Sequence, residues 1–206
     1  MANYNAIRYN VPYSDGGAGC LRLIKTLTAS SSSTLSFVNG SSDVVLDSTY
    51  KEYLFILNNI HPSGNAVAFQ FNGSADTGSN YNATKTTTFF QSYSEEDGGS
   101  ASFGYDTGSD LAQSTSFQNF TSGSSANNND DCLAATVKLF NPSSTTFVKH
   151  FLIDASTINS SSDPNISRNH ISGYFNTSSA IDAIQFKFAS GTIAVSYTHL
   201  TLPTIL

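Results

Sequence analysis

The sequence contains little charge. Only 9 Lys or Arg and 15 Asp or Glu residues occur among 206 positions, so 12% of the chain is charged, against about a quarter in average soluble domains. The basic residues are scattered along the chain and do not form a stripe. Such a stripe would be needed to neutralise nucleic-acid phosphates or to hold the chain on an anionic membrane. We therefore expect no nucleic-acid partner and no membrane partner.

Signals for export, membrane insertion and disulfide cross-linking are also lacking. Residues 1–10 show no basic run followed by an apolar stretch, so we expect no signal peptide and synthesis in a cytoplasm. The strongest apolar run, residues 53–57, is far too short to span a bilayer. Cys20 and Cys132 do not make a disulfide framework. We expect two free thiols, although pairing between them stays open.

Metal and cofactor motifs are missing as well. Neither cysteine has a partner at metal-ligand spacing, and the glycine-rich run at residues 15–19 lacks the Lys-Ser/Thr ending of a phosphate-binding loop. Acidic clusters at residues 95–97 and 127–131 offer the oxygen ligands that calcium favours, but neither has the spacing of an EF-hand. We expect both clusters to be solvated loops, and we expect no metal ion and no cofactor.

The chain is rich in aromatic and apolar residues that alternate with polar ones. It has 15 Phe and 10 Tyr, which suit a packed sheet, and no window shows the 3.6-residue period of a helix. Strand-like runs occur at residues 21–28, 34–38, 51–59, 67–71, 84–93, 101–105, 133–140, 147–155, 171–175 and 183–189. Turn signals such as Asn39-Gly40 and Asn72-Gly73 separate several of them.

This spacing predicts a single all-β domain. The predicted fold is a β-sandwich of jelly-roll type with nine or ten strands and long polar loops. We expect an irregular N-terminal arm at residues 1–20 and the sandwich at residues 21–194. Within the sandwich, residues 29–33 are predicted to form a turn. Phe147 is predicted to point into the core from the start of the strand at residues 147–155.

The segment Asp-Thr-Gly-Ser occurs twice, beginning at Asp76 and at Asp106. Aspartic proteases use such a pair so that two carboxylates share one proton and activate a water molecule. That chemistry needs each Asp on a buried, apolar loop, and the two copies here follow each other too closely to form two lobes of such an enzyme. Because Asp and Gly are ordinary turn residues, we interpret both segments as turns.

Other catalytic arrangements have little support. His61, His150 and His170 would each need a neighbouring Asp and one of the many serines to make a triad, and no nucleophile elbow Gly-x-Ser-x-Gly is present. A hydrolase acting on host polysaccharide would need two carboxylates about 5–10 Å apart that face one cleft. No pattern in the sequence indicates such a pair, so we expect no enzymatic activity.

Aromatic residues near the polar loops are the best candidates for ligand contact. Those in or beside the loops are Tyr81, Tyr93, Phe103, Tyr105 and Phe120. Aromatic faces flanked by carboxylates and amides suit sugars, which present both C–H faces and hydroxyl groups. The predicted ligand-binding residues are Tyr81, Tyr105, Asp76 and Asp106. Alternatively, the aromatic side chains only anchor long loops to the sandwich.

The last residues differ in character from the rest of the chain. Residues 196–206, which read SYTHLTLPTIL, carry Leu and Pro at a density seen nowhere else in the sequence. They resemble the translated sequencing-adaptor string found at the ends of many metagenomic open reading frames. We therefore interpret residues 195–206 as a non-native tail in the place of a native final strand. We expect residues 198–206 to pack poorly, or Leu200, Leu202 and Ile205 to lie on the surface.

Much of the remaining chain resembles a group of small uncharacterised proteins from marine bacteriophages. The resembling segments are residues 23–26, 50–62, 106–112, 140–150 and 173–188, and residues 189–193 match the start of the last strand of that group. The resemblance implies a jelly-roll structural protein on the tail, fibre or capsid surface of a virion. It also implies other virion subunits as partners, copies of the same chain among them. No catalytic residues are known to carry over from this group.

Two functions stay open for the sequence. The first is a non-enzymatic phage virion protein that acts by subunit packing and by contact with the host surface. The second is a carbohydrate-binding β-sandwich module that holds a cell-surface glycan with loop aromatics and acidic residues.

Overall fold

The computed structural model describes residues 21–123, 125, 127–128, 131–159 and 164–203, so the predicted N-terminal arm lies outside the described residues. Within them the chain forms strands and no helix, which confirms the predicted all-β class. No helix in this part of the chain could span a membrane. The strands are β1 (Leu21–Ser32), β2 (Leu35–Val38), β3 (Glu52–Pro62), β4 (Phe69–Ser74), β5 (Lys85–Glu95), β6 (Ala101–Tyr105), β7 (Gln118–Asn119), β8 (Leu133–Phe140), β9 (Lys149–Asn159), β10 (Asn165–Phe175), β11 (Ala183–Phe188) and β12 (Ile193–Pro203).

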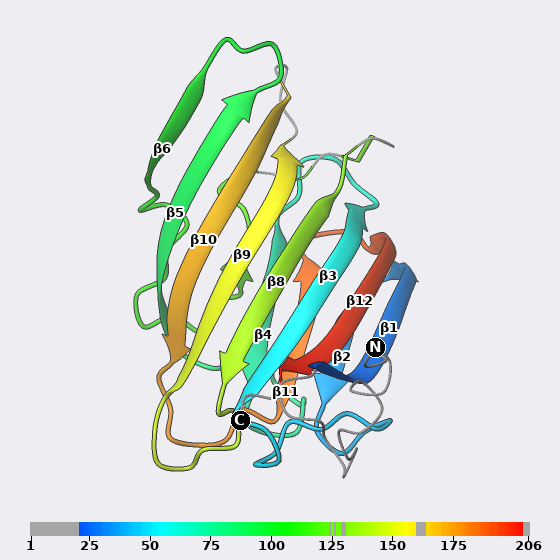
Figure 1. The fold of residues 1–206 in the computed structure, drawn as a ribbon, viewed down its shortest axis with the longest axis vertical. Coiled ribbons are helices and arrows are strands. Elements are labelled where there is room, and N and C mark those ends of the chain that lie inside the picture. Colours follow the sequence, from blue (N-terminus) through cyan, green and yellow to red (C-terminus); the bar gives the residue numbers. More distant parts are fainter. Residues whose placement is uncertain (1–20, 124, 126, 129–130, 160–163, 204–206) are drawn as a thin grey trace, which may run out of the picture.

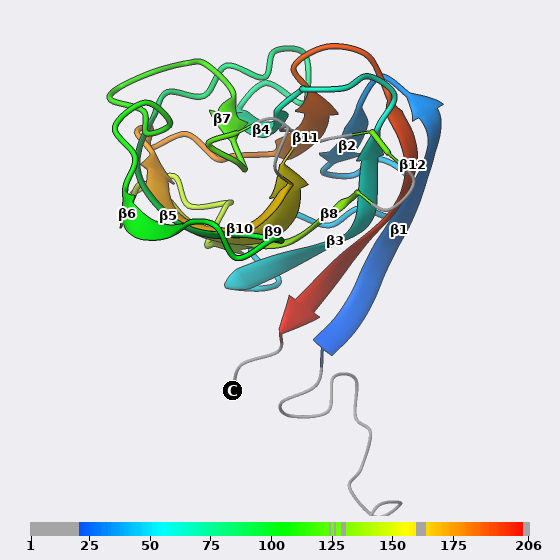
Figure 2. The same ribbon diagram turned by 90° about the horizontal axis from the view of Figure 1, so that it is seen from above.

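The strands form two antiparallel sheets that pack face to face (Figure 1). The larger sheet has eight strands in the order β1-β12-β3-β8-β9-β10-β5-β6, and the smaller sheet has four in the order β2-β11-β4-β7. Figure 2 shows the larger sheet curving along one side of the smaller one. The predicted β-sandwich is therefore confirmed.

The strand pairing is that of a jelly roll. If the inserted strands β5, β6, β9 and β10 are set aside, the first remaining strand pairs with the last, the second with the second-last, and so on inwards. These four pairs are β1·β12, β2·β11, β3·β8 and β4·β7. A ribbon of four such pairs that is wrapped into two stacked sheets makes the double Greek key of a jelly roll.

The inserted strands lengthen the larger sheet. β5 pairs with β6 after β4, and β9 pairs with β10 after β8. Together they continue the sheet beyond β8 in the order β9-β10-β5-β6, which we call the sheet extension. In Figure 1 the extension occupies the left half of the molecule, with β6 at the far left. β6 is therefore one edge of the eight-stranded sheet and β1 is the other.

Alternate residues of the two sheets meet in an aromatic core. The ring of Phe37 on β2 lies 5.4 Å from that of Phe55 on β3, and Phe71 on β4 lies 5.1 Å from Phe151 on β9. All four rings are buried, and both pairs join the smaller sheet to the larger one. Burying a side chain of this size contributes roughly 1.5–3 kcal/mol relative to its exposed state, and edge-on ring contacts add to that.

Two local predictions are corrected by the structure. Residues 29–33 were predicted to form a turn, but β1 continues to Ser32, because Ala29 is buried against the core and the strand keeps pairing with β12. Phe147 was predicted to point inward, yet it lies before β9 and is 70% exposed. The first inward position of β9 is taken by Lys149, which is fully buried.

The C-terminal segment forms an interior strand. β12 lies between β1 and β3 and pairs with both along its length. A strand therefore does follow Gly191, where a final strand was expected. The side chains of residues 195–203 and all of residues 204–206 lie outside what the structure describes. The predicted exposure of the tail's Leu and Ile side chains, and its non-native origin, stay predictions.

Candidate functional site

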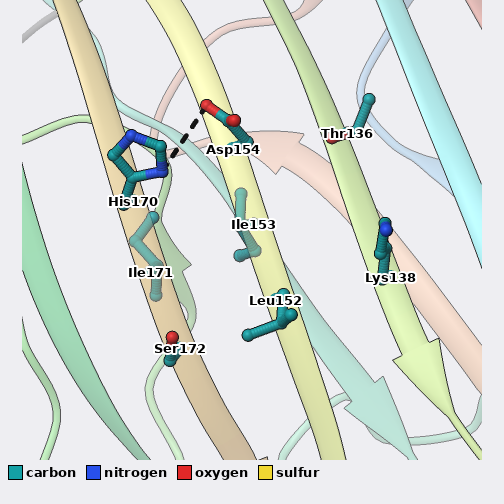
Figure 3. A pocket seen from close by; sticks show the side chains of 8 residues that line it. All are labelled: Thr136, Lys138, Leu152, Ile153, Asp154, His170, Ile171 and Ser172. Atoms are coloured by element: carbon teal, nitrogen blue, oxygen red, sulfur yellow. Dashed lines mark ion pairs between the residues drawn. The ribbon is translucent and has the colours of Figure 1, made fainter.

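The outer face of the sheet extension carries a linked group of charged side chains. Asp154 on β9 lies directly opposite His170 on β10, with Arg168 two residues before His170. Strand alternation turns these side chains outward, because their chain neighbours Ile153, Asn169 and Ile171 are buried on the inward face. Figure 3 shows Asp154 and His170 side by side on neighbouring strands.

Asp154 is held from two sides. Arg168 donates from Nε and Nη2 to the two carboxylate oxygens at 3.0 and 2.6 Å, and His170 Nδ1 lies 3.8 Å from Oδ1. The hydrogen bonds from Arg168 hold the pKa of Asp154 below its usual value and raise that of Arg168. This carboxylate is therefore a charged acceptor at neutral pH. The two-pronged pair fixes geometry, but on an exposed face it adds little to stability.

A shallow groove of about 280 Å³ lies beside this ion pair (Figure 3). Its lining residues are Thr136, Lys138, Leu152, Ile153, Asp154, His170, Ile171 and Ser172. Leu152 is 44% exposed, lies opposite Lys138 in the β8·β9 ladder and supplies apolar surface to the groove. The groove therefore offers a partner donors, one carboxylate and an apolar contact on an open face.

Two neighbouring grooves continue this surface. One shares Thr136 and Asp154 with the first groove, and the other shares Leu152 and Ser172 with it. The three grooves thus form one band across β3, β8, β9, β10 and β5, which we call the outer band. Asp154 is the one carboxylate that lines any of the three. The paired carboxylates of a glycoside hydrolase are not found within the outer band.

Three aromatic rings gather where the outer face meets the β6 edge. Phe90 on β5 stacks with Phe103 on β6, with ring centroids 6.4 Å apart, and Tyr105 lies edge-on to Phe90 at 5.1 Å. Phe103 is 74% exposed, Tyr105 44% and Phe90 40%. These rings, which we call the edge aromatic patch, leave the face of a large apolar cluster open to solvent.

Two of the predicted ligand-binding residues, Asp76 and Tyr81, lie in the turn between β4 and β5. The Asp76 carboxylate accepts hydrogen bonds from Ser74 Oγ at 2.6 Å and from the backbone and side-chain amides of Asn80 at 2.9 and 2.7 Å. These bonds, that from Ser74 first, lower the pKa of Asp76 to about 2. The Tyr81 carbonyl accepts from the buried Asn72 side chain. Asp76 thus holds its own turn together.

The other two, Tyr105 and Asp106, lie at the end of β6. The Tyr105 hydroxyl donates to Asp110 at 2.6 Å, which raises the pKa of Tyr105. Asp106 accepts from the Gly108 amide and the Ser109 hydroxyl, both at 2.8 Å. The four predicted residues therefore form two pairs on two turns, and among the described hydrogen bonds none joins one turn to the other. Both Asp-Thr-Gly-Ser segments are turns, as predicted.

The remaining sequence candidates fall in different places. Phe120, which the sequence placed among the loop aromatics that are candidates for ligand contact, is buried against Phe69 and Phe71, so it belongs to the core. Cys132 is an exposed free thiol, and Cys20 lies outside the described residues. In the part of the chain that the structure describes, no group of three or more His, Cys, Asp or Glu side chains is placed to hold a metal ion.

Comparisons with known proteins add no relative. No family model matches the chain, no curated protein matches it, and no solved structure matches it.

Sequence reasoning missed the grouping of Arg168 with Asp154 and His170. The strand that became β10 was predicted only from residue 171, so Arg168 and His170 fell in a predicted loop. Residues 165–170 alternate between the two faces of the sheet, but their inward side chains are polar, so no apolar alternation marks them as a strand. Ser167 and Asn169 are the inward residues of this half of β10, and both are buried. A search for polar alternation beside a predicted strand would have extended it.

Proposed function

We propose that this protein is a non-enzymatic structural protein of a bacteriophage virion, a tail, fibre or capsid-surface module that acts by subunit packing and by contact with the host surface. The observation that supports this most directly is the jelly-roll ribbon β1·β12, β2·β11, β3·β8 and β4·β7, an architecture common in viral capsid and lectin domains. The sequence resemblance to marine phage proteins supports the same setting. Because a fold hosts many functions, the surface must support the proposal as well.

The outer face of the sheet extension is suited to contact with another protein. Leu152 and Ile166 are exposed among the charged groups of β9 and β10, and they alternate with Asp154 and Arg168. Apolar contacts interspersed with directional polar groups are typical of protein–protein interfaces. The grooves there are shallow, and their single carboxylate is already bound by Arg168. These features favour a packing surface over a catalytic cleft.

Mass spectrometry of purified phage particles tests the virion proposal. Particles are purified by density gradient from an infected host whose phage carries this reading frame, and both particles and whole-cell lysate are digested. We expect peptides of residues 21–194 in the particle fraction at a level comparable with other structural proteins. A replication protein of the same phage serves as the control and should appear only in the lysate. Peptides found in the lysate but absent from particles would reject the proposal.

A carbohydrate-binding module is the second candidate. The edge aromatic patch favours it, because a hydroxyl group shares its face: Ser92 on β5 lies directly opposite Phe103 in the β5·β6 ladder. A sugar ring stacked on Phe103 would find a hydroxyl partner in Ser92, whereas the polar groove that holds Gln91, Tyr93 and Ser102 lies on the opposite face of these strands.

A glycan array, read with and without calcium, tests this second function. If the patch binds a sugar, Phe103→Ala should abolish the signal, whereas Phe147→Ala should not, because Phe147 is similarly exposed but lies far from β6 in the chain. No binding above background in either condition would dispose of the glycan function and leave the virion proposal standing.

A further inference from the structure

The two edges of the eight-stranded sheet are protected to different degrees. β1 carries Arg22 and Lys25, and a bulge interrupts its register between Leu23 and Lys25. Charged side chains and bulges are the usual means by which proteins prevent an edge strand from pairing with another chain. β6 has none of these features. Its sequence, Ala-Ser-Phe-Gly-Tyr, contains no charge and no proline, and its pairing with β5 runs without a register shift.

The backbone of β6 presents free hydrogen-bonding groups at the sheet edge. The Asp106 amide donates to the carbonyl of Phe89, and the Ser100 carbonyl accepts from Glu95, so the even-numbered residues face β5. Because successive residues of a strand point their backbone groups to opposite sides, the amides and carbonyls of Ala101, Phe103 and Tyr105 face away from the sheet. All five residues of β6 are exposed.

We infer that β6 is a self-association edge, at which a second copy of this chain adds its own β6 in antiparallel orientation about a two-fold axis at Phe103. Phe103 then lies opposite the partner's Phe103, Ala101 lies opposite the partner's Tyr105, and Tyr105 lies opposite the partner's Ala101. Each of these pairs exchanges two backbone hydrogen bonds, because all three residues have outward-facing groups. The larger sheets of the two copies become one continuous sheet.

The side chains make a second copy a better occupant than an unrelated peptide. Ala101, Phe103 and Tyr105 point to the same face as Phe90, so the two-fold arrangement joins the edge aromatic patches of both copies into one cluster. Phe103, the most exposed ring of the patch, moves to the centre of that cluster. An isologous contact requires a patch that complements itself, and an uncharged strand with its aromatic residue at the middle position meets that requirement.

Charge around β6 sets a condition on the association. Glu96 and Asp97 lie in the turn before β6, and Asp106 follows it. Antiparallel pairing brings the acidic turn of one copy towards Asp106 of the other. The dimer is therefore strengthened by salt, because ions screen this repulsion while the backbone hydrogen bonds and the aromatic cluster are little affected.

This inference rests on the proposed packing function and names the surface through which two copies would pack. The test uses the purified full-length protein. Sedimentation velocity over a range of concentrations should show a monomer–dimer equilibrium that shifts towards dimer between about 0.05 and 0.5 M NaCl. Phe103→Lys places like charges directly opposite each other and should weaken the dimer about tenfold or more. Phe147→Lys is the matched control, since Phe147 is 70% exposed, and should leave the dimer unchanged.

Two further variants separate the backbone contact from the aromatic one and place the axis. Ala101→Pro removes an outward amide without touching an aromatic ring or the pairing with β5, and it should also weaken the dimer. Phe103→Cys, with Cys20 and Cys132 changed to Ser, should form a disulfide-linked dimer on oxidation, because opposed residues of such a pair lie about 5.5 Å apart between Cα atoms.

Three outcomes overturn the inference. They are a protein that stays monomeric at all concentrations and salt levels, a dimer unaffected by both Phe103→Lys and Ala101→Pro, and a dimer in which Phe103→Cys does not cross-link. If the purified protein is monomeric in solution but abundant in purified virions, the β6 contact is rejected and the virion function is left intact. If the purified protein forms the β6 dimer but is absent from virions, the virion function is rejected and the β6 contact is kept.

Discussion

Lys85 and Lys149 occupy inward positions of their strands, and both are fully buried. The Lys85 ammonium donates to the carbonyl oxygen of Ser116, and burial lowers the pKa of Lys85 to about 7. The Lys149 ammonium donates to three backbone carbonyl oxygens, those of Ser144, Phe147 and Thr177. A buried charge is costly unless hydrogen bonds replace its water, so these two lysines should differ in their effect on stability.

Lys85→Met should stabilise the protein at pH 7 and remove a pH dependence. In the native protein Lys85 loses its proton near pH 7, whereas in the unfolded chain a lysine holds its proton up to about pH 10.4. The unfolded state therefore binds more protons between these values, and the free energy of unfolding should rise with pH across that window. Urea unfolding at pH 7, 8, 9 and 10 measures it. A wild-type slope equal to that of Lys85→Met would contradict the prediction.

Lys149→Met should have the opposite effect. Three carbonyl oxygens would lose their donor, and hydrogen bonds from a charged group contribute about 1.5–3 kcal/mol each before the cost of burying the charge is subtracted. The free energy of unfolding at pH 7 should fall, with Lys85→Met as the matched comparison of the same substitution. A Lys149→Met protein as stable as Lys85→Met would show that the carbonyls find other partners.

At the scale of single strands, apolar alternation decided what could be predicted. Residues 101–105 and 133–140 were predicted with the bounds they have as β6 and β8, since their flanks are clear turns. β7 has two residues, too few to show any period. The first half of β10 was missed because its inward residues, Ser167 and Asn169, are polar. Patterns of hydrophobicity find a strand only where its buried face is apolar.

Gly173 of β10 should be intolerant of any side chain. A Cβ atom there would lie 2.5 Å from Phe151 Cζ and 2.7 Å from Thr87 Cγ2, closer than real contacts allow. Gly173→Ala should therefore lower the free energy of unfolding by about 1–3 kcal/mol, the range for overpacked cores. Gly104→Ala on β6 is the control, because nothing lies within 4 Å of the position that its new methyl group would take. Chemical denaturation of both variants measures the difference, and equal effects would mean that the β9–β10 face relaxes freely.

At the scale of the whole molecule, strand count predicted a sandwich, but the order of strands was beyond the sequence. β1 and β12 stand at opposite ends of the described chain and yet pair along their lengths. No local pattern links them. The same holds for the outer band, where Arg168 and Asp154 meet only because β9 and β10 are inserted as a pair. The residue types of a site can be read from a sequence, but their grouping depends on the register.

Removal of residues 195–206 should disrupt the fold. β12 separates β1 from β3, so its loss leaves the facing backbone groups of both strands without partners and exposes new edges. The shortened protein should lose its cooperative thermal transition or aggregate. Deletion of residues 204–206 alone is the control and should change little, because the described pairing ends at Pro203. Calorimetry of both proteins decides this, and a shortened chain that melts as cooperatively as the full one would contradict it.

The pairing of Leu21 with Pro203 has a mechanical meaning. The chain enters and leaves the sandwich at the same corner, where β1 and β12 lie side by side (Figure 2). A force that pulls Leu21 and Pro203 apart would break the hydrogen bonds of the β1·β12 ladder one after another, starting at this corner. A force between Leu21 on β1 and the distant β6 edge would instead act across all seven strand-to-strand ladders of the sheet, and a force between Pro203 on β12 and that edge would act across six of them. The protein should thus unfold at a low force when it is pulled between Leu21 and Pro203. It should need a higher force when it is pulled between one of these residues and β6.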